Sequence, residues 1–183
     1  MRPARGVRPR SAAARLSALL LAVAPLAGCG ITHVQDLNFR VDNRLHFVAP
    51  KDRSKVRPPL TISWRITGFR IAALGSEPAT RNAGYFAVFV DRQPIRPEQT
   101  VKAVATDPFC KRDPKCPDTS YLNSHGVYLT TATSLRLDQV STINTNDDKV
   151  QRHTFIVVLM DTAGHRIGES AWELDLRIPR PGL

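Results

Sequence analysis

The sequence predicts an all-β fold in which two antiparallel sheets form a sandwich, and three patterns support this class. Segments 60–66 (LTISWRI) and 171–178 (AWELDLRI) place apolar side chains at every second position, as strands with one buried face do. Segments 85–90 (YFAVFV) and 155–160 (FIVVLM) are apolar throughout, rich in β-forming residues and too short for helices. The rest of the chain after the N-terminal segment shows turn residues and no helical periodicity of useful length, which favours a sandwich.

The first strand is expected within residues 37–47 (LNFRVDNRLHF), where the apolar side chains all fall on odd positions. A two-residue turn at Asp42 and Asn43 would mix the two faces, so one long or broken strand is the better interpretation. The strand at 60–66 follows and carries Trp64 among its apolar side chains.

The two fully apolar segments are expected in the middle of a sheet. They are either central strands covered on both faces or strands with an apolar outer face. In the second case Tyr85, Ala87 and Phe89 would be exposed together and would need a binding partner.

The C-terminal part of the chain is expected to form a hairpin. Its strands are residues 155–161 and 169–178, and the connection contains Gly164, which suits a turn position with positive φ. Residues 126–137 (GVYLTTATSLRL) add one or two further strands.

The first 28 residues have the organisation of an export signal. Residues 1–15 contain five arginines and no acidic residue, and residues 16–27 are apolar or small. This apolar run has roughly 12 residues, whereas a membrane-spanning helix needs about 20. Pro25 would also disturb a helix near its end, so a permanent membrane span is not expected.

The end of this segment, LAGC, resembles the lipobox of bacterial lipoproteins. The resemblance rests on Leu26, Ala27, Gly28 and Cys29. It implies that the Cys29 thiol is alkylated with diacylglycerol, that the peptide is cut before Cys29, and that the new amino terminus is acylated. Several acyl chains would anchor the protein to the extracytoplasmic face of a cell membrane. Gly30, where inner-membrane retention favours Asp, is compatible with an outer-membrane destination in a two-membrane envelope.

The alternative is an ordinary secretory signal in which Cys29 occurs by chance. With residues 1–28 removed, residues 29–36 would be a lipidated tether and residues 37–183 a single domain. Removal takes away five of the 26 basic residues and none of the 16 acidic ones, so the formal charge falls from +10 to +5. The smaller charge and the exported location argue against a nucleic-acid partner.

Residues 47–64 (FVAPKDRSKVRPPLTISW) resemble the first two strands of bacterial immunoglobulin-like or fibronectin-type modules. In these families a proline-bounded loop leads to a strand with a core tryptophan, a role that the resemblance gives to Trp64. It implies a single immunoglobulin-like sandwich, from which the long segment 104–125 departs. The same stretch holds the densest basic cluster, Lys51–Arg57, which is either a solvated loop or an anion-binding surface.

Lipidation of Cys29 would leave Cys110 and Cys116 as a pair in CKRDPKC. Disulfides persist outside the cytoplasm, and this one would close a loop of seven residues. The alternative is a metal site, but zinc sites use shorter cysteine spacings and four ligands. We therefore expect a disulfide near 104–125 and no metal or other cofactor.

The disulfide-containing loop, DPFCKRDPKCPDTSY, is the main candidate for a binding site. Prolines and the disulfide would stiffen it, and a stiff loop loses less entropy on binding. The candidate contact residues are two aromatic anchors and three cations: Phe109, Tyr121, Lys111, Arg112 and Lys115. The alternative is that the disulfide only constrains a long connection.

Candidate catalytic and calcium-binding residues are sparse. Ser124 and His125 lie near Asp107 and Asp118 in the sequence, but a catalytic triad depends on geometry in space, and a polar loop is expected. The histidines form no HxH or HExxH pattern. Residues 144–148 (NTNDD) offer oxygen ligands without EF-hand spacing, so a turn is expected there.

These observations predict a lipid-anchored, non-enzymatic binding or scaffold domain that contacts a protein partner in the bacterial envelope. One alternative is a domain that binds anionic envelope polymers or lipid headgroups through its basic loops. A second alternative is an enzyme with an unrecognised site, which a cleft joining Ser124, His125 and an acid would favour.

Overall fold

The computed structural model describes residues 42–141 and 149–180. Internal contacts divide the chain into two units, Met1–Phe39 and Arg40–Leu183, and the described residues belong to the second. The lipobox residues, the expected tether and the first part of the expected strand at 37–47 lie outside the described residues.

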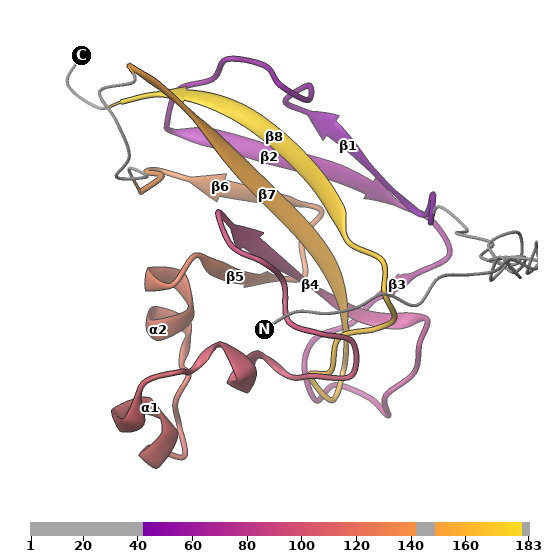
Figure 1. Ribbon diagram of the computed structural model, residues 1–183. Coiled ribbons are helices and arrows are strands. Elements are labelled where there is room, and N and C mark those ends of the chain that lie inside the picture. Colours follow the sequence, from indigo (N-terminus) through magenta and orange to yellow (C-terminus); the bar gives the residue numbers. More distant parts are fainter. Residues whose placement is uncertain (1–41, 142–148, 181–183) are drawn as a thin grey trace, which may run out of the picture. The chain divides into compact units, whose positions relative to one another are not determined.

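Two β-sheets dominate this part of the chain, which confirms the predicted all-β class (Figure 1). The smaller sheet is antiparallel and has the strand order β1 (Leu45–Ala49), β2 (Leu60–Ile66), β6 (Ser134–Leu137). The larger sheet has the strand order β3 (Arg70–Ile71), β4 (Ala83–Val90), β7 (Val150–Asp161), β8 (Trp172–Pro179), and β5 (Val127–Thr130) also pairs with β4. Within this sheet only the short β3 runs parallel to its neighbour.

The two sheets face each other across one hydrophobic core. Trp64 of β2 lies against Phe86 of β4, with the ring centroids 5.2 Å apart in an edge-to-face arrangement. Phe155 of β7 and Leu174 of β8 belong to the same core and are almost fully buried. Strand β2 coincides with the predicted segment 60–66, and its alternation places the apolar side chains in this core, as predicted.

Strands β4 and β7 are buried on both faces. On the face away from the smaller sheet, Tyr85, Ala87 and Phe89 are buried in a second hydrophobic cluster with Val104 and Leu122 from the segment that follows β4. The interpretation as covered central strands is therefore confirmed. The alternative of an exposed apolar face at Tyr85, Ala87 and Phe89 is wrong, because residues from segment 95–122 cover it.

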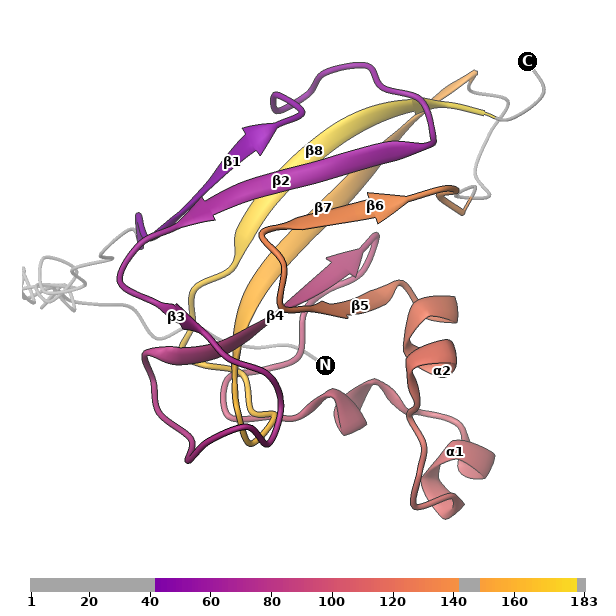
Figure 2. The ribbon, with the colours of Figure 1, turned by 180° about the vertical axis from the view of Figure 1, so that it is seen from behind.

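The covering segment contains three short helices that the sequence pattern did not predict: η2 (Val101–Val104), α1 (Pro108–Arg112) and α2 (Thr119–Ser124). Elements of this length are too short to show a helical period. Aspartate caps start two of them: the Asp107 carboxylate accepts from the N–H of Cys110 at 2.8 Å, and the Asp118 carboxylate from the N–H of Tyr121 at 2.7 Å. Figures 1 and 2 show α2 beside the end of β5 and α1 farther from the sheets.

Residues 126–137 supply two strands, one for each sheet. Strand β5 pairs with β4 in the larger sheet, whereas β6 pairs with β2 in the smaller one. The chain therefore crosses from one sheet to the other in the three residues between Thr130 and Ser134.

The predicted C-terminal hairpin is confirmed. Strands β7 and β8 pair in antiparallel register from Val150 with Pro179 to Val157 with Trp172. Strand β8 begins at Trp172, later than the expected start at residue 169. Gly164 in the connection has a φ of +90°, as the predicted turn requires.

Candidate functional site

The disulfide-containing loop folds into a projection around α1, which we call the α1 tip (residues 107–117). Cys110 and Cys116 are paired as predicted, with their Cα atoms 5.1 Å apart. Pro108 occupies the first turn, where a helix needs no N–H donor, and Asp107 caps it. A five-residue helix is not stable alone, so these constraints hold its backbone in place.

The α1 tip presents an aromatic ring among cations. Phe109 is 82% exposed, the largest fraction for a large hydrophobic side chain in the described part of the chain. Lys111, Arg112 and Lys115 are also exposed, and their side chains make no hydrogen bond or ion pair with another residue of the described ranges. Aromatic and arginine side chains supply much of the binding energy at protein interfaces.

Tyr121, the second predicted anchor, lies apart from this group. Its hydroxyl donates to the Asp107 carboxylate at 2.6 Å, and its ring stacks on His125 with centroids 4.0 Å apart. The bond to Asp107 raises the pKa of Tyr121. The N–H of Cys110 and then the Tyr121 hydroxyl lower the pKa of Asp107. Tyr121 therefore links α2 to the cap of α1, whereas Phe109 and the three cations are exposed residues of the α1 tip.

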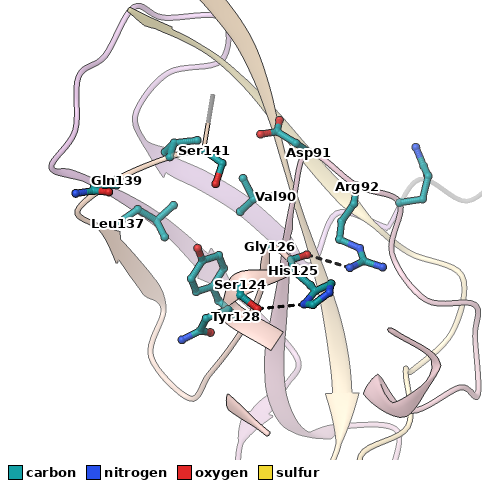
Figure 3. A pocket seen from close by; sticks show the side chains of 13 residues that line it. Val90, Asp91, Arg92, Ser124, His125, Gly126, Tyr128, Leu137, Gln139 and Ser141 are labelled. Carbon is teal, nitrogen blue, oxygen red and sulfur yellow. Dashed lines mark hydrogen bonds between the residues drawn. The ribbon is translucent and has the colours of Figure 1, made fainter. Parts of the chain in front are cut away.

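A pocket of about 480 Å³ lies beside the end of α2 (Figure 3). The end of β4, the α2–β5 connection and the residues after β6 form its walls. Ser124 and His125 lie on this wall, with Ser124 Oγ 3.1 Å from His125 Nδ1. The guanidinium of Arg92 supports the wall, because its Nη1 donates to the carbonyl oxygen of His125 at 2.9 Å.

Ser124 and His125 do not have the geometry of an activated nucleophile. His125 Nδ1 lies 2.7 Å from the carbonyl oxygen of Tyr121. Because a carbonyl oxygen only accepts, this Nδ1 carries a proton and cannot take one from Ser124. The Ser124 hydroxyl donates to the same carbonyl oxygen at 2.8 Å.

The nearby carboxylates have other partners. Asp107 and Asp118 cap the two helices. Asp91 lines the pocket but lies apart from Ser124 and His125 (Figure 3), and it contacts His153 Nδ1 at 2.7 Å and accepts from the N–H of Thr154 at 2.9 Å. Among residues 42–141 and 149–180, no acid completes a triad with Ser124 and His125.

The basic cluster Lys51–Arg57 forms the loop between β1 and β2, and its backbone is bound to β8. The carbonyl oxygen of Ser54 accepts from the N–H of Arg177 at 2.9 Å, and the N–H of Val56 donates to the carbonyl oxygen of Arg177 at 3.0 Å. Lys51, Arg53, Lys55 and Arg57 are all exposed. The loop therefore has a fixed backbone and exposed cationic side chains.

Sequence reasoning missed the residues that β7 and β8 bring to this loop. Asp175 occupies an outward position of β8, yet it is only 7% exposed because Arg152 of β7 and Thr154 bind its carboxylate. The only signal in the sequence was the row of charged residues at alternate positions of the last strand, Glu173, Asp175 and Arg177.

Comparisons with protein-family models, curated proteins and solved structures found no match. No helix in the described ranges is long and apolar enough to cross a membrane. Within the same ranges, no three His, Cys, Asp or Glu side chains converge as metal ligands. The possible calcium ligands at 144–148 lie outside the described residues.

Proposed function

We propose that this chain is a lipid-anchored, non-enzymatic binding module on the extracytoplasmic face of a bacterial membrane. In this proposal Cys29 carries the lipid, the two sheets form an immunoglobulin-like sandwich, and the α1 tip binds a protein partner of the envelope. The lipobox-like residues Leu26–Cys29 support the anchor. The burial of Trp64 between two sheets of mainly antiparallel strands supports the sandwich.

The exposure of Phe109 carries the binding part of the proposal. Burial of a phenylalanine ring contributes roughly 1.5–3 kcal/mol, and this ring is 82% exposed. The disulfide and the Asp107 cap fix the helix that presents it. A contact residue on a rigid support loses little conformational entropy when a partner binds.

The chemistry of the α1 tip defines the partner. An apolar pocket would receive Phe109, and acidic groups around that pocket would pair with Lys111, Arg112 and Lys115. Charges at the rim of an interface mainly steer association, whereas a buried aromatic ring contributes to the lifetime of the complex.

Site-specific photo-crosslinking in intact cells tests this proposal. A photoreactive phenylalanine analogue replaces Phe109, and mass spectrometry identifies the captured species. The same analogue at Val48, which is 58% exposed on β1, is the matched control. We expect one dominant protein partner captured at position 109 and not at position 48. Capture of the same mixture at both positions would contradict the proposal.

Two variants define the contact further. Charge reversal in the double variant Lys111→Glu and Lys115→Glu should reduce capture at position 109 by weakening association with an acidic partner. A Cys29→Ser variant tests the anchor: the partner should be lost if the anchor brings the two proteins together. Retention of full capture in a soluble Cys29→Ser protein would contradict the role of the anchor.

A further inference from the structure

Three arginines from distant parts of the sequence surround one aspartate on the larger sheet. Arg53 comes from the β1–β2 loop, Arg152 from β7 and Arg177 from β8, and with Asp175 they line a hollow of about 360 Å³. The β1–β2 loop lies at the opposite end of the strands from α1 in both ribbon views (Figures 1 and 2). The hollow is therefore a surface separate from the α1 tip.

Asp175 holds one of these arginines in position. Its carboxylate accepts from Arg152 Nη2 and, at 2.8 Å, from the Thr154 hydroxyl, and the residue is 7% exposed. The hydrogen bond from Arg152 is the main reason that the pKa of Asp175 is lowered, so the carboxylate is ionised at neutral pH. A guanidinium has five N–H groups, and this contact uses only one end of Arg152. The remaining N–H groups of the 68% exposed side chain face solvent.

The β1–β2 loop holds the second arginine in position. The N–H of Arg53 donates to the carbonyl oxygen of Asp175 at 2.6 Å, and the Asp52 carboxylate accepts from the N–H of Asp175 at 3.0 Å. Arg53 has a φ of +58°, a conformation that is uncommon for a residue with a side chain. Such conformations persist only where the surrounding contacts impose them, and they cluster at functional sites.

Cationic donors in this hollow exceed the carboxylates that bind them. Asp175 engages Arg152, and Asp52 Oδ2 lies 3.4 Å from Arg53 Nε. The guanidinium of Arg177 makes no hydrogen bond or ion pair with another residue in the described part of the chain. The hollow therefore presents guanidinium groups from three elements, and that of Arg177 has no partner among the described residues.

We propose that this hollow binds a phosphate group. Guanidinium groups bind phosphate oxygens through two parallel hydrogen bonds, a geometry that a lysine ammonium cannot provide. The phosphate can belong to a lipid headgroup or to a soluble phosphate compound, because both offer the same oxygens. This site does not depend on the proposed partner of the α1 tip.

The test uses the full chain with Cys29→Ser in every sample, so that a lipid anchor cannot produce membrane binding. Inorganic phosphate is titrated while the arginine Nε–H signals are followed by NMR. In parallel, co-sedimentation measures binding to vesicles of phosphatidylglycerol and of phosphatidylcholine. The test variant combines Arg53→Gln with Arg177→Gln and leaves the Arg152–Asp175 pair intact. The matched control combines Arg65→Gln with Arg81→Gln, which removes the same charge from exposed positions elsewhere.

We expect the test variant to bind phosphate, phosphatidylglycerol vesicles or both at least about tenfold more weakly, while the control stays within about twofold. A loss with vesicles alone identifies a lipid headgroup, and a loss with inorganic phosphate identifies a soluble ligand. If Arg177→Lys replaces Arg177→Gln in the test variant, only part of the affinity should return. Lysine restores the positive charge but not the two parallel N–H donors of the guanidinium. Equal losses in the test and control variants would show diffuse electrostatic attraction and would overturn the proposal. The proposal would also be overturned if the Cys29→Ser protein with all its arginines bound neither phosphate nor phosphatidylglycerol vesicles. A thermal unfolding midpoint equal to that of the Cys29→Ser protein confirms that each variant is folded.

Discussion

Asp42 connects the beginning of the described chain to the start of β8. Its carboxylate accepts from Arg44 Nη2 at 2.8 Å and from the Ser170 hydroxyl at 2.7 Å, and its carbonyl oxygen accepts from Trp172 Nε1 at 2.8 Å. The hydrogen bond from Arg44 is the main reason that the pKa of Asp42 is lowered to about 2. One side chain thus joins segments that are 128 residues apart in the sequence.

We expect Asp42→Asn to lower the free energy of unfolding by about 1 kcal/mol at neutral pH, because the charged hydrogen bonds are lost. A carboxylate with a lowered pKa stabilises the fold above its unfolded value of 3.8, and this contribution disappears as the pH falls through about 2. The difference between the original protein and the variant should therefore shrink between pH 4 and pH 2. Urea unfolding at several pH values measures it, and Asp138→Asn on the exposed surface is the control. A pH-independent difference would contradict the assignment.

Tyr121 connects the two helices through Asp107, and after the N–H of Cys110 its hydroxyl is the donor that lowers the pKa of that carboxyl group most. In Tyr121→Phe the pKa of Asp107 should rise but should stay below its usual value, because the N–H of Cys110 still donates. NMR titration of the Asp107 side chain measures this change. Tyr128→Phe, which removes a hydroxyl elsewhere, should leave the Asp107 titration unchanged.

The α1 tip and the segment that covers β4 and β7 (residues 95–122, the helical cover) are held in place by different interactions. Cys110 and Cys116 hold α1, whereas Leu122 of α2 fixes the cover to β4 and β7 through the second hydrophobic cluster. The two supports predict different effects of substitution.

Replacement of both cysteines by serine should loosen the α1 tip and leave the sheets intact. In the chain-entropy account, a disulfide that closes a loop of seven residues stabilises the folded state by about 2 kcal/mol. Hydrogen exchange should accelerate in residues 108–116 while the amides of β4 and β7 stay protected. Faster exchange in β4 and β7 of the same magnitude would show that the disulfide supports the whole fold.

Leu122→Ala should destabilise the whole fold by about 2–4 kcal/mol, because it leaves a cavity in the hydrophobic cluster that also contains Phe89 and Val158. Leu122 is 3% exposed, whereas Leu129 is 36% exposed, so Leu129→Ala is the matched control and should cost much less. Chemical unfolding of both variants measures the difference. Equal losses would mean that the helical cover does not contribute to the core.

The sequence predicted the strands more completely than it predicted the short helices of the covering segment. Alternation at 60–66 located β2 residue by residue, because a half-buried strand imposes a period of two. The helices at 108–112 and 119–124 are shorter than two turns and leave no period, so only the capping aspartates signal them. Continuous apolar runs at β4 and β7 indicated burial on both faces without showing what covers the second face.

At the scale of the whole molecule, the surfaces proposed for binding have different origins. The α1 tip is formed by one continuous segment, so its aromatic and basic residues were visible in the sequence. The arginine hollow combines Arg53, Arg152 and Arg177, which only the strand order brings together. No local pattern could predict that site, because its residues belong to three different elements.

The proposed lipid anchor at Cys29 is tested on the full chain. We expect the protein to fractionate with membranes and to incorporate labelled palmitate, because stable attachment needs more than one acyl chain. Cys29→Ser should abolish the label and release a folded protein. Cys110→Ser is the control for general cysteine loss and should keep the label. Membrane association of Cys29→Ser that survives high salt and carbonate washing would contradict the lipid anchor.

The loop between β1 and β2 also protects the sheet to which it is bound. Strand β8 ends the order of the larger sheet, and the edge of a sheet offers unpaired N–H and carbonyl groups to strands of other molecules. Residues 53–56 occupy these groups at Asp175 and Arg177. Release of the loop would uncover a strand whose alternate residues are apolar, which is a template for aggregation. The segment that positions Arg53 at the proposed phosphate site therefore also hinders strand pairing between copies of the chain.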